Sequence, residues 1–267
     1  MRRPICDQRP STLTRPVPIV VLGAYCRLTV AVHTDAHHRL TRTAIMNSVR
    51  TENVMTGTRY GTVGMIGVGA SLLALSALHI LDPDLSVVDQ YISEYALGDY
   101  AWLSVAANFA LGAGVIAIAL GLRDTLAASR RARASWILVL VAGVGFIVSG
   151  VFPTDRPGGE TTTAGAVHDI GGYVSLLGLL ISAWMLRGVF ARDDAYRFFA
   201  RTQLAFAVLL TLAFAGVFLL FELSVGLPQR AFLLVTLIWL FVLSLTIVKV
   251  VRTQHGAIPE LSPGTPI

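Results

Sequence analysis

Long apolar segments separated by short polar stretches dominate the sequence from residue 60 onward. Each approaches the roughly 20 apolar residues that a helix needs to cross the hydrocarbon core of a bilayer. The segments lie near residues 61–81, 101–122, 135–152, 164–186, 202–224 and 231–249. The pattern predicts an all-α integral membrane protein, a six-transmembrane-helix bundle over residues 56–252 with a short polar cytoplasmic tail at 253–267. Because the connections are short, consecutive helices are expected to form antiparallel hairpins.

The six predicted helices differ in side-chain size. The fourth has a face of small side chains and one histidine, at spacings of 3, 4, 3 and 4: His168, Gly171, Ser175, Gly178 and Ser182. Similar steps occur in the first two helices, Gly67/Ser71 and Ala110/Gly114. Small residues let neighbouring backbones approach closely in a membrane. Residues 232–248 are bulky throughout, so we expect the sixth helix at the periphery, against lipid.

The charges in the loops predict an orientation. Loops 123–134 and 187–201 carry four arginines each, and Lys249 and Arg252 follow the last segment. Loop 82–100 has five acidic residues and no basic one. Since basic loops stay in the cytoplasm, both termini are expected to be cytoplasmic, in a bacterial plasma membrane.

Composition agrees with a membrane protein. The chain is 54% hydrophobic and only 14% charged, with a mean hydropathy of +0.67. These values exclude a cytosolic enzyme and a nucleic-acid-binding domain, and no nucleic-acid partner is expected. The net charge of +5 comes from residues 1–59, which hold nine arginines against three acidic residues.

Residues 1–55 do not resemble a membrane segment. They are rich in arginine and proline, and their one apolar run, 17–32, is interrupted by Arg27. We expect a disordered extension or a mis-called start, with Met46 as the alternative first residue. Both cysteines, Cys6 and Cys26, lie in this stretch, so no thiol chemistry is expected from residue 60 onward.

Titratable side chains gather at the predicted outer ends of the helices. They are His79, Glu94, Asp155, His168, Asp169 and Glu222, with Ser93 as a further polar neighbour. Ionisable groups are costly inside a membrane, so each is a candidate functional residue. His168, Asp155, Asp169 and Glu94 are the candidate catalytic residues.

Several chemistries fit parts of this set. His79, Asp155 and His168 could ligate a divalent metal with Asp169 or Glu94 as general base, although no HExxH spacing is present. His79 and His168 could ligate a haem. Ser93 or Ser149 could act with His168 and Asp155 in hydrolysis, but no Gly-x-Ser-x-Gly motif occurs.

A carrier and a purely structural role also fit these residues. Glu222, His168 and Asp155 could relay a proton, although polar residues on the inner side are limited to Thr202 and Gln203. Structurally, Asp155 could hold the turn after Pro153, Thr163 could cap the fourth helix, and Glu222 could pair with Arg230.

Two motifs resemble a known family. They are YISEYALGDYAWL at 91–103 and FPTDRPGGETTTAGAVH at 152–168. The positions that carry the likeness are Ser93, Tyr95, Gly98, Trp102, Phe152, Pro153, Asp155 and His168. The chain thus resembles, over roughly 60–250, the bacterial membrane family named domain of unknown function 998 (DUF998). The resemblance implies a six-helix membrane protein with no assigned biochemical activity.

These observations favour a non-enzymatic multi-pass membrane protein that binds a lipid or a partner at its outer face. No cofactor is predicted, apart from the divalent metal that a hydrolase would need. A metal-dependent membrane hydrolase and a small-solute or proton-coupled carrier are the alternatives. A protein partner or a homo-oligomer is left open by the sequence.

Overall fold

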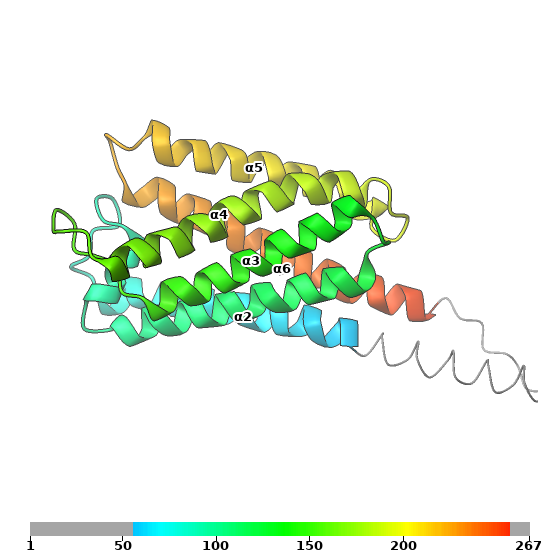
Figure 1. Cartoon of the computed structure of the whole chain (residues 1–267), viewed down its shortest axis with the longest axis horizontal. Helices are drawn as coiled ribbons and strands as arrows, with labels where there is room; N and C mark the ends of the chain where they lie inside the picture. Colours follow the sequence, from blue (N-terminus) through cyan, green and yellow to red (C-terminus); the bar gives the residue numbers. More distant parts are fainter. Residues whose placement is uncertain (1–55, 257–267) are drawn as a thin grey trace, which may run out of the picture. The chain divides into compact units, whose positions relative to one another are not determined.

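The computed structural model describes residues 56–256 (Figure 1). The predictions for residues 1–55 and for 257–267 lie outside the described residues. Within the described part the chain is helical, and six of its helices are long and apolar enough to cross a membrane. The prediction of an all-α, six-span protein is therefore confirmed.

The elements follow one another along the described chain with short connections. They are the first span (Thr56–Leu81), the 3-10 helix η2 (Ile92–Leu97), α2 (Ala101–Thr125), α3 (Arg130–Val151), α4 (Thr163–Phe190), the 3-10 helix η3 (Arg197–Phe199), α5 (Ala200–Leu219) and α6 (Gly226–Gly256). The fifth helix is shorter than predicted, because a turn at 220–223 ends it at Leu219. Glu222 therefore lies in the connection to α6 and not in a helical turn.

The helical bundle has two chemically different ends. We call the end formed by residues 82–100, 152–162 and 220–225 the acidic end, because its first loop contains five acidic and no basic residues. We call the end formed by residues 126–129 and 191–199 the arginine end, because arginines flank both connections. The first span begins and α6 finishes at the arginine end (Figure 1).

Small residues bring the helices into close contact, as the sequence predicts. On α4, a Cβ placed on Gly171 would lie 2.8 Å from the carbonyl oxygen of Gly145 on α3. The Ser175 hydroxyl of α4 donates to the carbonyl oxygen of Ala142 on α3 at 2.8 Å, so a hydrogen bond joins the two helices where they are close. The predicted small-residue face of α4 is therefore the face that packs on α3.

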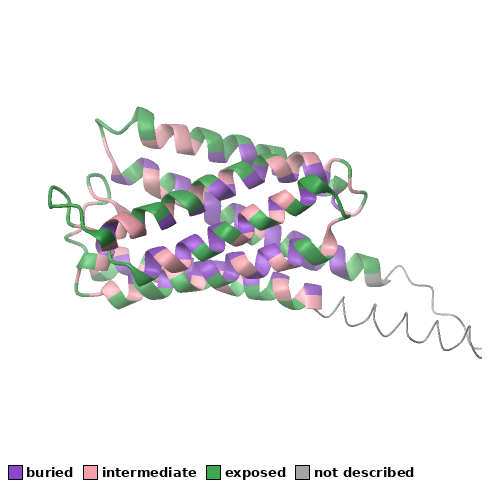
Figure 2. Cartoon of the chain, viewed as in Figure 1, coloured by how far each residue is buried: buried purple, intermediate pink, exposed green. Residues whose placement is uncertain are grey.

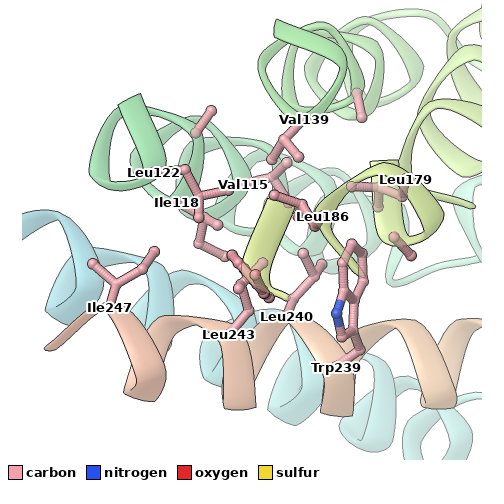
Figure 3. Packing of buried hydrophobic residues seen from close by; sticks show 14 of the residues in the cluster. Val115, Ile118, Leu122, Val139, Leu179, Leu186, Trp239, Leu240, Leu243 and Ile247 are labelled. Atoms are coloured by element: carbon pink, nitrogen blue, oxygen red, sulfur yellow. The ribbon is translucent and has the colours of Figure 1, made fainter. Parts of the chain in front are cut away.

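The prediction that the sixth helix lies at the periphery is wrong. Trp239, Leu240 and Leu243 of α6 are fully buried, and they point into the core with residues of α2, α3 and α4 (Figure 3). The peripheral helix is α5, which packs mainly on α4 and α6 and is mostly exposed (Figure 2). Bulk apolarity could not separate the two helices, because lipid tails are as apolar as a protein core.

A buried polar contact connects the three last helices. The Gln203 amide nitrogen on α5 donates to the carbonyl oxygen of Ala183 on α4 at 2.9 Å. Its amide oxygen accepts from Trp239 Nε1 on α6, also at 2.9 Å. A carrier would need the Gln203 side chain as part of a polar path. This side chain is fully buried, and both the nitrogen and the oxygen of its amide are hydrogen-bonded.

Candidate functional site

Two adjoining cavities at the acidic end form the candidate site. The mouth cavity, about 310 Å³, lies under the loops, and the inner cavity, about 110 Å³, lies between the helices. Five residues line both of them: Ser93, His168, Gly172, Leu176 and Gln229. The two cavities therefore adjoin each other and share part of their lining.

The two cavities differ in polarity. The mouth cavity is lined in addition by Tyr91, Glu94, Thr154, Asp155, Pro157, Asp169 and Tyr173. The inner cavity is lined in addition by Ser71, Leu75, Ile92, Ser104, Ala107, Asn108, Leu111, Phe146, Ser149, Phe232 and Leu233. Carboxylates thus border only the mouth, and the inner lining is mostly apolar with a few hydroxyl and amide groups.

His168 lies at the boundary between the cavities and is held by the end of α3. Its Nδ1 is 2.8 Å from the carbonyl oxygen of Ser149 and 2.9 Å from that of Phe152. Carbonyl oxygens only accept, so Nδ1 carries the proton and donates to both. The opposite ring nitrogen, Nε2, then remains as the ring atom that can meet a molecule in the cavities.

Glu94 is a buried carboxylate that supports the mouth. It accepts from the backbone N–H of Tyr91 at 2.7 Å and from the Gln90 amide at 3.1 Å, and so it fixes the start of η2. Gln229 of α6 accepts from the backbone N–H of Ile92 at 2.8 Å. These bonds position η2 over the cavities.

Asp155 holds the loop before α4. Its two oxygens accept from the backbone N–H of Thr162 at 2.9 Å and from the Thr162 hydroxyl at 2.7 Å. That hydroxyl in turn accepts from the N–H of Gly165 at 3.1 Å, so Thr162 caps α4 and the prediction of Thr163 as the cap is wrong. Asp155 therefore stabilises the turn that begins the helix, one of the roles the sequence suggested for it.

Asp169 and Tyr91 give the mouth its charge environment. Asp169 is exposed at the start of α4 and forms no hydrogen bond among the described residues. Burial raises the pKa of the Tyr91 phenol, and Tyr173, Glu94 and Asp169 nearby raise this pKa further. Within residues 56–256, no lysine or arginine lines either cavity, so an uncompensated negative potential is expected at the mouth.

Two of the predicted site residues lie elsewhere. His79 lines neither cavity: its ring contacts Tyr95, and its Nε2 accepts from Arg230 Nε at 3.0 Å. Glu222 is exposed in the turn after α5, and it forms no ion pair with Arg230 in the described part of the chain. Across residues 56–256, no three His, Cys, Asp or Glu side chains form a group that could hold a metal ion, so His79, Asp155 and His168 are not brought together.

Several cavity residues are uncharged and were not predicted from the sequence. Asn108 is the one amide in the mostly apolar second segment, which also contains Ser104, and it lines the inner cavity. Gln229 precedes the predicted start of the sixth segment, and Gly172 follows the small-residue face by one position. An isolated amide in an apolar segment is a signal that could have identified Asn108, whereas Gln229 and Gly172 carry no comparable signal.

Comparison with known protein families gives a match. A family model described as "Protein of unknown function (DUF998)" matches residues 65–246. No curated protein and no solved structure matches the chain. The matched range contains both cavities and the five residues that they share.

Proposed function

The chain belongs to the DUF998 family of proteins of unknown function, so its role must be sought in its own cavities, and we propose that it binds an amine-bearing lipid. The lipid headgroup occupies the mouth cavity, and the first part of its apolar tail enters the inner cavity. The protein acts as a binding protein of the membrane and not as an enzyme.

The observation that carries this proposal is the pairing of a polar and an apolar cavity with shared walls. Ligand sites are typically concave, mostly apolar and provided with a few oriented polar groups. Here the polar groups lie at the mouth and the apolar surface lies between the helices, which matches an amphipathic molecule oriented along the membrane normal.

The charge of the mouth selects the headgroup. Glu94, Asp155 and Asp169 border it, and neither cavity has a lysine or arginine among the described residues of its lining. A primary amine carries a positive charge and donates hydrogen bonds to carboxylates, whereas a phosphate alone would be repelled. His168 Nε2 and the Gln229 side chain add further hydrogen-bonding groups beside the carboxylates.

The distribution of basic residues indicates which end of the bundle faces the cytoplasm. Most basic residues of the six-helix region lie toward the arginine end, whereas Arg156 and Arg230 lie toward the acidic end. By the positive-inside rule, the arginine end faces the cytoplasm and the mouth cavity opens to the outside of a bacterial plasma membrane. The lipid therefore comes from the outer leaflet.

Native mass spectrometry of the detergent-purified full chain with dioleoyl-phosphatidylethanolamine tests the proposal. Asp169→Asn should weaken binding by up to about fivefold, because an exposed charge contributes little more than this. The matched control is Asp99→Asn, since Asp99 is exposed at the same end but lines neither cavity.

A second variant tests the inner cavity. A Cβ on Gly172 would meet only the Ser149 hydroxyl, at 3.7 Å, so a longer side chain there extends into the cavity without a backbone clash. Gly172→Leu should therefore abolish the bound lipid and leave the fold intact. Equal binding in the wild type, Asp169→Asn and Gly172→Leu would contradict the proposal.

A further inference from the structure

A third hollow lies on the side of the bundle, between the first span and α6. This lateral groove, about 340 Å³, has a wall of leucines: Leu72, Leu75, Leu233, Leu234 and Leu237. It shares no described lining residue with the mouth cavity, but it shares Leu75, Ile92 and Leu233 with the inner cavity. Leu72 and Leu234 of this wall are exposed, so the groove opens to the side of the bundle, and it ends near the acidic end at His79 and Arg230.

Arg230 is held in place by neutral groups. Its Nε donates to His79 Nε2 at 3.0 Å, and its Nη1 donates to the carbonyl oxygens of Val87 at 3.1 Å and of Gln90 at 2.6 Å. The centre of the Tyr95 ring lies 5.9 Å from the guanidinium carbon. These contacts orient the guanidinium group, but none of them supplies a negative charge.

The His79 ring beside Arg230 carries no positive charge of its own. Its Nδ1 lies 2.6 Å from the carbonyl oxygen of Leu75, and so this nitrogen must donate. Its Nε2 must accept, because the partner atom is an arginine N–H. The ring is therefore neutral, and its hydrogen bond holds the Arg230 side chain in place.

The charge of Arg230 lacks a counter-ion in the described part of the chain. The ion pairs within residues 56–256 join Arg123 with Asp124 and Arg197 with Asp194. The Nη2 atom of Arg230 is buried and has no hydrogen-bond partner there. A buried donor without an acceptor is costly, and a guanidinium group is well suited to a phosphate oxygen.

We propose that the lateral groove binds an anionic phospholipid, with an acyl chain along its leucines and the phosphate at Arg230. The apolar wall fits a chain that is already in the membrane, and the unmatched charge at the end of the wall fits the headgroup. The site is distinct from the mouth cavity, whose carboxylates repel a net negative headgroup. Binding here does not depend on the amine-lipid proposal.

The experiment is native mass spectrometry of the full chain in detergent with dioleoyl-phosphatidylglycerol, compared with dioleoyl-phosphatidylcholine. Phosphatidylglycerol should bind about fivefold more tightly, as expected for one basic residue near an anionic headgroup. Arg230→Gln should remove that preference. Because this variant also loses contacts to the 87–90 loop, a second variant is needed that leaves the guanidinium group in place.

Leu234→Trp fills the groove without touching the contacts of Arg230. Leu234 is 48% exposed, so the larger side chain should not disturb the core, and phosphatidylglycerol binding should be lost. The matched control is Leu212→Trp on α5, where Leu212 is 64% exposed and lines none of these three hollows. This control should bind as the wild type does.

Three outcomes would overturn the proposal. They are equal binding of the two lipids by the wild type, unchanged phosphatidylglycerol binding in Leu234→Trp, and displacement of the lipid by excess inorganic phosphate, which would indicate a small-anion site. The two proposals are separable, because Gly172→Leu should keep phosphatidylglycerol and Leu234→Trp should keep phosphatidylethanolamine.

Discussion

His168 and Ser149 exchange hydrogen bonds across the α3–α4 interface. The Ser149 hydroxyl donates to the carbonyl oxygen of His168, and His168 Nδ1 lies at hydrogen-bond distance from the carbonyl oxygen of Ser149, both at 2.8 Å. Each residue thus satisfies a backbone group of the other helix. His168 lines both cavities and Ser149 lines the inner one, so the candidate site and the helix packing depend on the same pair.

Replacing His168 should destabilise the protein. His168→Ala leaves the carbonyl oxygens of Ser149 and Phe152 without this donor and opens a small void, which together should cost about 2–3 kcal/mol. Unfolding in mixed micelles with increasing SDS measures the change. The neighbouring variant Asp169→Asn should unfold as the wild type does, since Asp169 is exposed. Equal stability of His168→Ala and wild type would refute the structural role of the imidazole.

Two adjacent glycines should respond oppositely to the same substitution. Gly171→Ala places a methyl group 2.8 Å from the carbonyl oxygen of Gly145 and should lower the free energy of unfolding by about 1–3 kcal/mol. Gly172→Ala has room and should be neutral or stabilising by up to about 1 kcal/mol, because alanine favours helix. Thermal unfolding of the two variants side by side checks the prediction, and the reverse order would be incompatible with the α3–α4 contact.

The buried contact between Gln203 and Trp239 should show energetic coupling. Trp239→Phe leaves the Gln203 amide oxygen without its donor, and Gln203→Leu leaves Trp239 Nε1 without its acceptor. The double variant removes both partners, so its cost should be smaller than the sum of the single costs by about 0.5–1.5 kcal/mol. A double-mutant cycle in SDS unfolding gives this coupling energy. Strict additivity would show that the bond contributes nothing to stability.

Stability should fall at alkaline pH in a way that depends on Tyr196. Burial raises the pKa of the Tyr196 phenol above its usual value of 10.0, so the folded state keeps a proton that the unfolded state loses. The contribution to stability is therefore complete below pH 10 and decreases as the pH rises above it. In Tyr196→Phe the fall above about pH 10 should be shallower, as followed by thermal unfolding between about pH 8 and 11. A fall of identical steepness in both proteins would count against this assignment.

The hydrophobic pattern alone was sufficient to predict the helices. Crossing a bilayer requires about 20 apolar residues whose backbone groups bond within the segment, and this requirement leaves a clear signal in one sequence. The close-packing face of α4 was also predictable, because glycine and serine at spacings of 3 and 4 are typical of a helix face that a neighbouring backbone approaches. The end of the fifth helix was predicted five residues too late, since residues 220–224 are apolar except for Glu222 and Ser224 although the chain turns there.

The tertiary structure decided which helices and side chains meet. The sequence placed six titratable residues at one depth. The fold brings Glu94, Asp155, His168 and Asp169 to the mouth cavity, whereas His79 contacts Arg230 and Glu222 is exposed in the turn after α5. The fold also buries α6 and leaves α5 at the periphery. The apolarity of the two segments does not predict this difference. The physical reason is that membrane insertion depends on each segment's own composition. Lateral order in the bundle depends instead on shape and on a few polar pairs between helices, and these appear only once the helices are packed.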